Sequence, residues 1–174
     1  MGLIFLCGLP GVGKTTVGKM LARARGRPLI DLDDEIQIRA QKSITEIFEQ
    51  DGEEEFRELE ASTLARVCTQ VAEGIVVLGA GALMREENRQ QVESIGTLVY
   101  LKASPDVIAS RCADWSERPL MIDASSRSQV KARLDELMSL RSIGYSSARY
   151  IIEIGFEMSA EDVAAAVSSA LLDS

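Results

Sequence analysis

A short segment near the start of the chain has the residue types and spacing of a phosphate-binding loop. Residues 8–15 match the pattern GxxxxGK[ST], after an apolar segment and before a segment of helical period. Glycines let backbone N–H groups surround phosphate oxygens, and the N-terminus of the following helix favours the same anion. The lysine would reach the β- and γ-phosphates, and the first threonine would offer its hydroxyl to Mg²⁺. The predicted ATP site comprises Gly11, Val12, Gly13, Lys14, Thr15 and Thr16.

Three carboxylates, Asp31, Asp33 and Asp34, follow a second apolar segment. In open α/β sheets ligands bind beyond the carboxyl ends of the strands, which is where these acids are expected. Because neighbouring carboxylates repel one another, their clustering indicates that cations such as Mg²⁺ and Lys14 lie nearby. The alternative is that Asp33 or Asp34 caps the helix predicted over 35–40.

Short apolar segments alternate with longer segments of helical period, which predicts an α/β fold of the P-loop NTPase type. We expect a single kinase domain over 1–174, with three layers and a central five-stranded parallel sheet flanked by helices. Nearly continuous apolar segments are typical of strands that helices cover on both faces. The predicted strands are 3–7, 28–30, 75–78, 97–101 and 150–154.

Local chemistry supports several helix starts. Ser43 with Glu46, and Ser159 with Asp162, have the spacing of capping boxes, and residues 104–106 offer an N-cap serine, a proline and an acid. The segment 112–127 breaks any periodicity with serines, aspartates and a proline, and it is predicted to form a mobile lid.

Composition excludes several classes of protein. The 27 acidic and 19 basic residues give a net charge of −8, which argues against a nucleic-acid partner. The 3 cysteines are widely spaced and predict reduced thiols in a cytoplasmic protein rather than a disulfide framework or a zinc site. No apolar segment has the length of a membrane helix, so no membrane partner is expected. Since the chain has no histidine, a general base must be another side chain, such as a carboxylate.

With these motifs in place, the chain resembles the shikimate kinase family from Gly8 to about Tyr145. The family's Asp-x-Asp falls on residues 31–33, and its Phe-Arg-x-x-Glu falls on residues 56–60. Leu-Gly-Ala-Gly at 78–81 takes the place of the triple glycine, and residues 118–120 resemble the start of the lid motif Arg-Pro-Leu-Leu. An Arg-x-x-x-Tyr pattern follows at 141–145.

The resemblance implies a role for each matching residue. Lys14, Asp33 and Arg118 would be catalytic, with Asp33 also binding the substrate hydroxyl, while Thr15 and Asp31 would hold Mg²⁺. Arg111 would stack on adenine. The segment 33–62 would bind substrate, and the substrate contacts implied are Asp33, Arg57, Gly79, Ala80, Gly81 and Arg141.

Each of these residues also has a simpler interpretation. Arg57 could form an i,i+4 surface pair with Glu53, and Arg141 could offset a helix dipole. Arg111 and Arg118 could be solvated charges, and the glycines at 79 and 81 could mark a turn. The agreement of all these spacings with one family favours the functional interpretation. Ala80 departs from the family's glycine and bears on how the acceptor is held.

We therefore expect a monomeric kinase that uses ATP and Mg²⁺ to phosphorylate a hydroxyl of a small hydroxylated carboxylic acid. Shikimate is the leading acceptor, in keeping with the resemblance, which also implies a place in aromatic amino-acid biosynthesis. Two alternatives remain open: a related kinase for another polyol acid such as gluconate, and a nucleotide-binding module without transferase activity.

Overall fold

The central sheet is built from apolar segments that lie inside the molecule. In the computed structural model, which describes residues 2–111 and 126–172, five strands form one parallel sheet in the order β2-β3-β1-β4-β5. Every residue of β1 and β3 is buried, which explains their uninterrupted apolar sequences. The predicted parallel α/β sheet is confirmed. The strands are β1 (Leu3–Cys7), β2 (Leu29–Asp31), β3 (Gly74–Val77), β4 (Gly96–Ala103) and β5 (Tyr150–Ile154).

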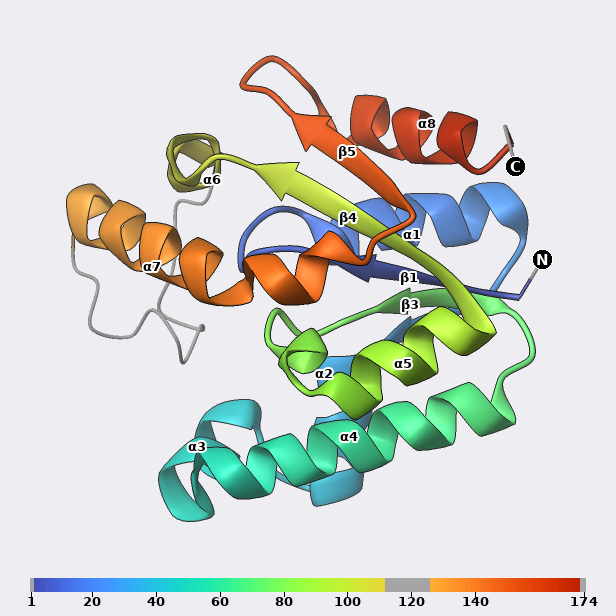
Figure 1. The fold of residues 1–174 in the computed structure, drawn as a ribbon, viewed down its shortest axis with the longest axis vertical. Coiled ribbons are helices and arrows are strands. Elements are labelled where there is room, and N and C mark those ends of the chain that lie inside the picture. The colour runs from blue at the N-terminus through green and yellow to red at the C-terminus, as the bar shows by residue number, and fades with distance from the viewer. Residues whose placement is uncertain (1, 112–125, 173–174) are drawn as a thin grey trace.

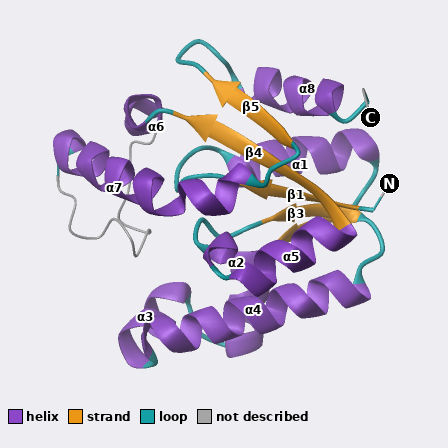
Figure 2. Cartoon of the chain, viewed as in Figure 1, coloured by secondary structure: helices purple, strands orange, loops and turns teal. Residues whose placement is uncertain are grey.

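Helices cover both faces of this sheet (Figures 1 and 2). Helices α1 and α8 pack together on one side, whereas α4 and α5 lie on the other (Figure 1). No helix in the described part of the chain has the length and apolarity needed to cross a membrane. The helices are α1 (Lys14–Arg25), α2 (Leu32–Ala40), α3 (Ile44–Gln50), α4 (Gly52–Gln70), the 3₁₀ helix η1 (Ala82–Met84), α5 (Glu86–Ile95), α6 (Pro105–Arg111), α7 (Arg127–Ser146) and α8 (Ala160–Ala170).

Strands β1 and β5 have the predicted bounds, and the other three shift by one or two residues. Strand β2 begins one residue late, at Leu29; Pro28, which has no N–H to donate, still accepts a hydrogen bond from Ile75 through its carbonyl at 2.9 Å. Strand β3 ends at Val77, although the N–H of Leu78 still donates to Leu6 at 3.0 Å.

The helix starts largely follow the predicted caps. Ser43 and Ser159 both form reciprocal capping boxes, and the Ser104 hydroxyl accepts from the N–H of Val107 at 3.3 Å. A further capping box, Ser126 with Gln129, opens α7. The predicted loop 112–127 is therefore two residues too long, since Ser126 is a cap and Arg127 is helical. Residues 112–125 lie outside the described part of the chain.

The start of helix α2 shows that the alternative role given to Asp33 or Asp34, capping a helix over 35–40, is wrong. Its N-cap is Asp31, not Asp33 or Asp34, and the helix begins at Leu32 rather than at position 35. Asp31 has the extended backbone of a cap residue, with φ −94 and ψ 119, and its side chain accepts from the N–H of Asp33 at 3.2 Å. Because Asp31 caps the helix, the next carboxylates lie in its first turn and Asp33 is left available for the site.

Candidate active site

The segment from Gly8 to Gly13 curls between β1 and the first turn of α1. Gly8 has a φ of 148°, and a Cβ there would lie 2.6 Å from the carbonyl oxygen of Leu101, so only glycine fits. Gly13 caps α1 in the left-handed region with no side-chain hydrogen bond, and the first turn contains no acidic residue. The first-turn N–H groups of α1 therefore face the loop with the positive end of the helix dipole, an arrangement suited to an anion.

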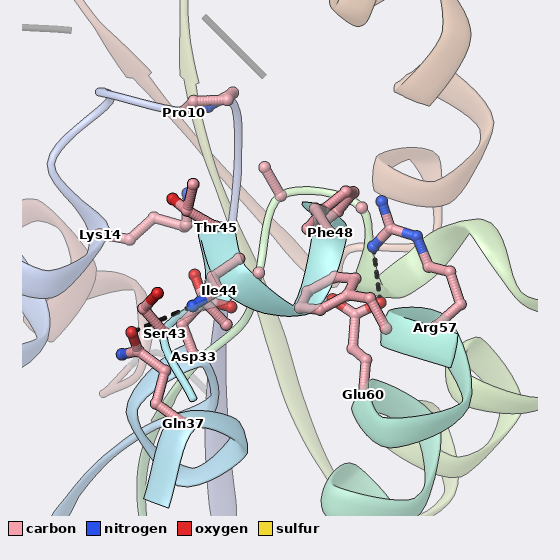
Figure 3. Close-up of a pocket in the computed structure, with 14 residues that line it drawn as sticks. Pro10, Lys14, Asp33, Gln37, Ser43, Ile44, Thr45, Phe48, Arg57 and Glu60 are labelled. Carbon is pink, nitrogen blue, oxygen red and sulfur yellow. Dashed lines mark hydrogen bonds and ion pairs between the residues drawn. The ribbon is translucent and has the colours of Figure 1, made fainter. Parts of the chain in front are cut away.

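Lys14 lies across the curl of this loop. Its ammonium donates to the carbonyls of Gly8 at 3.0 Å and Leu9 at 3.1 Å. The side chain is half-buried and lines the same cavity as Asp33. A positive charge is thus held at the junction of the phosphate-binding loop and that cavity (Figure 3).

Thr15 and Asp31 meet where α1 faces the end of β2. The Thr15 hydroxyl donates to the Asp31 carboxylate at 2.9 Å. Mg²⁺ favours oxygen ligands and usually keeps several waters, taking one or two protein carboxylates together with substrate phosphates. The pair fits such an ion, whereas the described residues contain no group of three or more acids or cysteines placed to enclose a metal alone.

Asp33 is the carboxylate that lines the cavity on the same side as Lys14 (Figure 3). Burial raises the pKa of Asp33 above its usual value, and the neighbouring charge of Asp31 acts in the same direction. Lys14 and Arg57 oppose the rise in this pKa. A carboxylate with a raised pKa between two cations is suited to accept a proton from a bound hydroxyl.

One cavity of ≈ 530 Å³ joins the phosphate-binding loop to helices α3 and α4 (Figure 3). Lys14 and Asp33 lie on one side, Arg57 and Glu60 on the other, as Figure 3 shows. The remaining lining residues are partly apolar and partly small: Pro10, Gln37, Ser43, Ile44, Thr45, Phe48, Phe56, Gly79, Ala80 and Gly81. The size and the few convergent polar groups suit a small polar molecule.

Arg57 is oriented by a buried ion pair. It donates to Glu60 at 2.7 Å and to the exposed Glu53 at 3.3 Å, so the surface pair expected from spacing forms but is not the main contact. Glu60 is only 1% exposed. Burial raises the pKa of Glu60, and Arg57 opposes that rise. Arg57 is thereby held at the cavity wall as a cation that can bind a carboxylate.

The glycines after β3 allow close approach of charged side chains. A Cβ at Gly79 would lie 2.7 Å from a carboxylate oxygen of Glu60, and a Cβ at Gly81 would lie 2.7 Å from Nη2 of Arg57. Both positions line the cavity, so these glycines do more than mark a turn.

Ala80 sits between these glycines without backbone strain, since its φ is not positive. This position therefore does not need the left-handed conformation that glycine adopts more readily than alanine. Its carbonyl accepts a hydrogen bond of 2.6 Å from the hydroxyl of Tyr145 on α7.

Arg141 lies buried behind the cavity and is not among its lining residues. It is close enough to Tyr145, Arg57 and Glu60 to interact electrostatically with all three. Burial lowers the pKa of this guanidinium. Among the described residues its buried Nη1 has no hydrogen-bond partner.

Comparison with known proteins agrees with this geometry. The family model described as shikimate kinase matches residues 10–171. The chain belongs to the shikimate kinase family. The shikimate kinase of Chlorobaculum parvum is 43% identical over 154 residues, covering 86% of this chain and 82% of the relative. That of Bordetella avium is 42% identical over 153 residues, covering 87% of this chain and 71% of the relative.

Solved structures of the shikimate kinase family have the same fold. A shikimate kinase from Acinetobacter baumannii in complex with shikimate is 31% identical, with a TM-score of 0.90 over 99% of this chain and 94% of that one. The shikimate kinase from Aquifex aeolicus is 29% identical, with a TM-score of 0.77 over 98% of this chain and 96% of that one. The family resemblance inferred from the motifs is thus confirmed.

The fold brings most of the site residues predicted from the shikimate kinase resemblance together. Thr15 and Asp31 are hydrogen-bonded to each other but are not among the residues that line the cavity, and Thr16 follows Thr15 in the first turn of α1. Arg118 lies outside the described residues. The predicted residues that share the cavity are Lys14, Asp33, Arg57, Gly79, Ala80 and Gly81.

Arg111 lies away from this cavity, at the end of α6. Its Nη2 donates to the carbonyls of Gly155, Phe156 and Met158 in the loop between β5 and α8; the contact with Met158 is 2.7 Å. The side chain is therefore not merely a solvated charge, because it contacts a loop at the carboxyl end of the sheet, the end at which open α/β folds bind ligands. Stacking on adenine stays a prediction.

Sequence reasoning missed part of the cavity wall. Ile44, Thr45 and Phe48 come from α3, whose start was visible in the Ser43 capping box, but the direction of its side chains was not. Tyr145 was noted only as the end of a family motif, and its contact with Ala80 spans 65 residues of sequence.

Proposed function

We propose that this chain transfers the γ-phosphoryl group of ATP to a hydroxyl of shikimate. The observation that carries the proposal is the single cavity that joins Lys14 and Asp33 to Arg57 and Glu60. A nucleotide on the phosphate-binding loop would direct its terminal phosphate to one end, and an acid bound at Arg57 would occupy the other. Relatives named shikimate kinase, and the related structure in complex with shikimate, support this acceptor.

In this arrangement positioning supplies most of the catalysis. Arg57 binds the acceptor carboxylate, and Arg141 reinforces the positive charge behind it. The acceptor hydroxyl then faces Asp33, which orients it and accepts its proton as the phosphorus–oxygen bond forms. Lys14 stabilises the charge on the three oxygens of the γ-phosphoryl group, which move to the acceptor, and on the bridging oxygen, which stays on ADP when its bond to the γ-phosphorus breaks. Arg118, which is predicted to belong to the lid, would contribute a second positive charge that stabilises these oxygens.

Mg²⁺ is the proposed metal ion, held through Thr15 and Asp31. When bound, such an ion neutralises phosphate charge and orients the polyphosphate chain. The residues present fit it, because they offer a hydroxyl and a carboxylate oxygen 2.9 Å apart beside the first turn of α1.

We also propose that the enzyme acts as a cytoplasmic monomer without a nucleic-acid partner. The net charge of −8 supports the last point. The two described cysteines, Cys7 and Cys68, are free thiols, which is typical of a reducing compartment.

The proposal is tested by coupled ADP release with MgATP and shikimate, gluconate or no acceptor. We expect ADP release to depend strongly on shikimate. Dependence on gluconate alone would establish a related kinase of different specificity, and nucleotide binding with no acceptor dependence would establish a binding module.

A further inference from the structure

Tyr145 connects helix α7 to the middle of the loop that follows β3. Its hydroxyl donates to the carbonyl of Ala80 at 2.6 Å, although the two residues are 65 positions apart. Tyr145 is 2% exposed, and its ring stacks on Tyr100 of β4 with centroids 4.8 Å apart. The contact is thus made by a side chain that packing holds in place.

The hydrogen bond from Tyr145 fixes a carbonyl that the turn hydrogen bonds of this loop do not use. Its two neighbours are glycines, and within the described residues the turn hydrogen bonds of this loop engage the carbonyls on either side of Ala80: Ala82 donates to Gly79 at 3.1 Å, and Met84 donates to Gly81 at 3.0 Å. Glycine permits a wide range of backbone conformations, so the peptide between Ala80 and Gly81 could otherwise rotate. Tyr145 removes that freedom by fixing the carbonyl.

Fixing one carbonyl also fixes the next N–H. A trans peptide is planar, so its C=O and N–H point in opposite directions. Since the carbonyl of Ala80 points to Tyr145 in the interior, the N–H of Gly81 points away from Tyr145. Gly81 lines the cavity, and its backbone lies against the guanidinium of Arg57. The orientation of this peptide therefore affects both a backbone donor and the side chain that is to bind the acceptor.

The same tyrosine adjoins the second arginine of the site. Arg141 lies one turn earlier on α7 and is 4% exposed, and its charge interacts with the phenol. Burial raises the pKa of Tyr145 above its usual range, and Arg141 opposes this rise. The phenol therefore keeps its proton at neutral pH and remains a donor to Ala80.

We infer that Tyr145 is a positioning residue of the acceptor site, which holds the Ala80–Gly81 peptide in the orientation that the bound acid requires. This inference rests on the proposed function for its kinetic consequence, but not for the hydrogen bond itself. Tyr145 acts through the loop and Arg141, and it is not assigned a contact with the reacting atoms.

The test is Tyr145→Phe, which keeps the stacked ring and removes the donor. We expect the KM for shikimate to rise about fivefold to tenfold, the scale of one lost hydrogen bond, with the KM for ATP unchanged. Tyr100→Phe is the matched control, because it alters the other ring of the stacked pair on β4, and we expect both KM values to stay at wild type. Equal rises in both KM values for Tyr145→Phe would show general loosening and overturn the inference, as would an unchanged KM for shikimate.

Amide hydrogen exchange of residues 78–82 in the nucleotide-free protein tests the inference independently of activity. We expect exchange in this segment to be faster in Tyr145→Phe than in wild type and in Tyr100→Phe. Unchanged exchange would overturn the inference. Absence of shikimate turnover in the wild-type protein would instead contradict the proposed function, so the two failures are distinguishable.

Discussion

The guanidinium of Arg57 lies against Gly81 with no room for a side chain between them. A Cβ at position 81 would lie 2.7 Å from Nη2 and 2.8 Å from Nη1. Nη1 of the same guanidinium donates to the buried carboxylate of Glu60 at 2.7 Å. The position of Arg57 therefore depends on two residues. Gly81 leaves room for the guanidinium because it has no side chain, and the carboxylate of Glu60 forms an ion pair with it.

Replacing this glycine is expected to impair acceptor binding without unfolding the protein. In Gly81→Ala the new methyl displaces the flexible end of Arg57, so the KM for shikimate should rise about tenfold to hundredfold while the KM for ATP stays unchanged. Steady-state kinetics with each substrate varied in turn measure this. Gly155→Ala is the control, because a Cβ there meets no atom within 4 Å, and its KM for shikimate should match wild type. A wild-type acceptor KM in Gly81→Ala would contradict the assignment of Arg57.

Asp33 is expected to lower stability at neutral pH while it supports turnover. Its pKa is raised in the folded protein, so the folded state binds this proton more tightly than the unfolded chain does. Ionisation of Asp33 therefore lowers the free energy of unfolding as pH rises through the folded-state pKa, and stability is greater below the unfolded value of 3.8.

In Asp33→Asn, kcat should fall about a hundredfold or more because the proton acceptor is lost. The melting temperature at pH 7 should equal or exceed that of wild type, and the difference should shrink in acid. Coupled kinetics and thermal unfolding at several pH values give both readouts. An active variant, or one less stable than wild type at pH 7, would show that Asp33 has a different role.

Thr15 is expected to set the Mg²⁺ requirement. Thr15→Val removes the hydroxyl that donates to Asp31 at 2.9 Å, so the Mg²⁺ concentration for half-maximal velocity should rise about tenfold. Thr15→Ser keeps a hydroxyl and should remain near wild type. The measurement is a Mg²⁺ titration at fixed ATP and saturating shikimate. If valine and serine gave the same titration curve, the hydroxyl would have no part in binding the ion.

Arg111 is expected to affect the nucleotide and not the acceptor. Arg111→Ala releases the carbonyls of Gly155 and Met158, so the loop between β5 and α8 becomes less ordered and the KM for ATP should rise about threefold to tenfold.

Lys102→Ala provides the matched control for Arg111, since it removes an exposed ion pair with Glu153 that links β4 to β5 at 2.8 Å. Such surface pairs contribute little, so the KM for ATP should not change. The KM for shikimate should be unaffected in both variants. If Arg111→Ala raised the KM for shikimate and left the KM for ATP unchanged, Arg111 would act on the acceptor site and the prediction would be contradicted.

Local patterns predicted the elements that depend on neighbouring residues. Strands 3–7 and 150–154 match their predicted bounds, because each ends directly before a glycine, Gly8 or Gly155. The capping boxes at Ser43 and Ser159 were equally visible, since both partners lie within one turn. The sequence could not show that Asp31 is the N-cap of α2, because any of the three nearby acids could accept a hydrogen bond from a first-turn N–H. The extended backbone of Asp31 is what makes it the cap.

Contacts across the fold explain what the sequence could not reveal. The spacing of Arg57 allowed partners at 53 and 60, and burial of Glu60 under the loop after β3 decides which is stronger. The hydrogen bond from Tyr145 to Ala80 depends on where α7 packs, which no local pattern determines. The position of Arg141 behind the cavity likewise follows from that packing.

The most direct test of the central claim is detection of the phosphorylated product. The protein is incubated with MgATP and shikimate, and the mixture is analysed by phosphorus NMR and mass spectrometry, with Arg57→Gln in parallel. We expect one phosphorylated acid in amounts equal to the ADP formed, and little of it with Arg57→Gln at subsaturating shikimate. ADP formed together with free phosphate and no phosphorylated acid, or equal product from Arg57→Gln, would contradict the proposal that this cavity binds and phosphorylates shikimate.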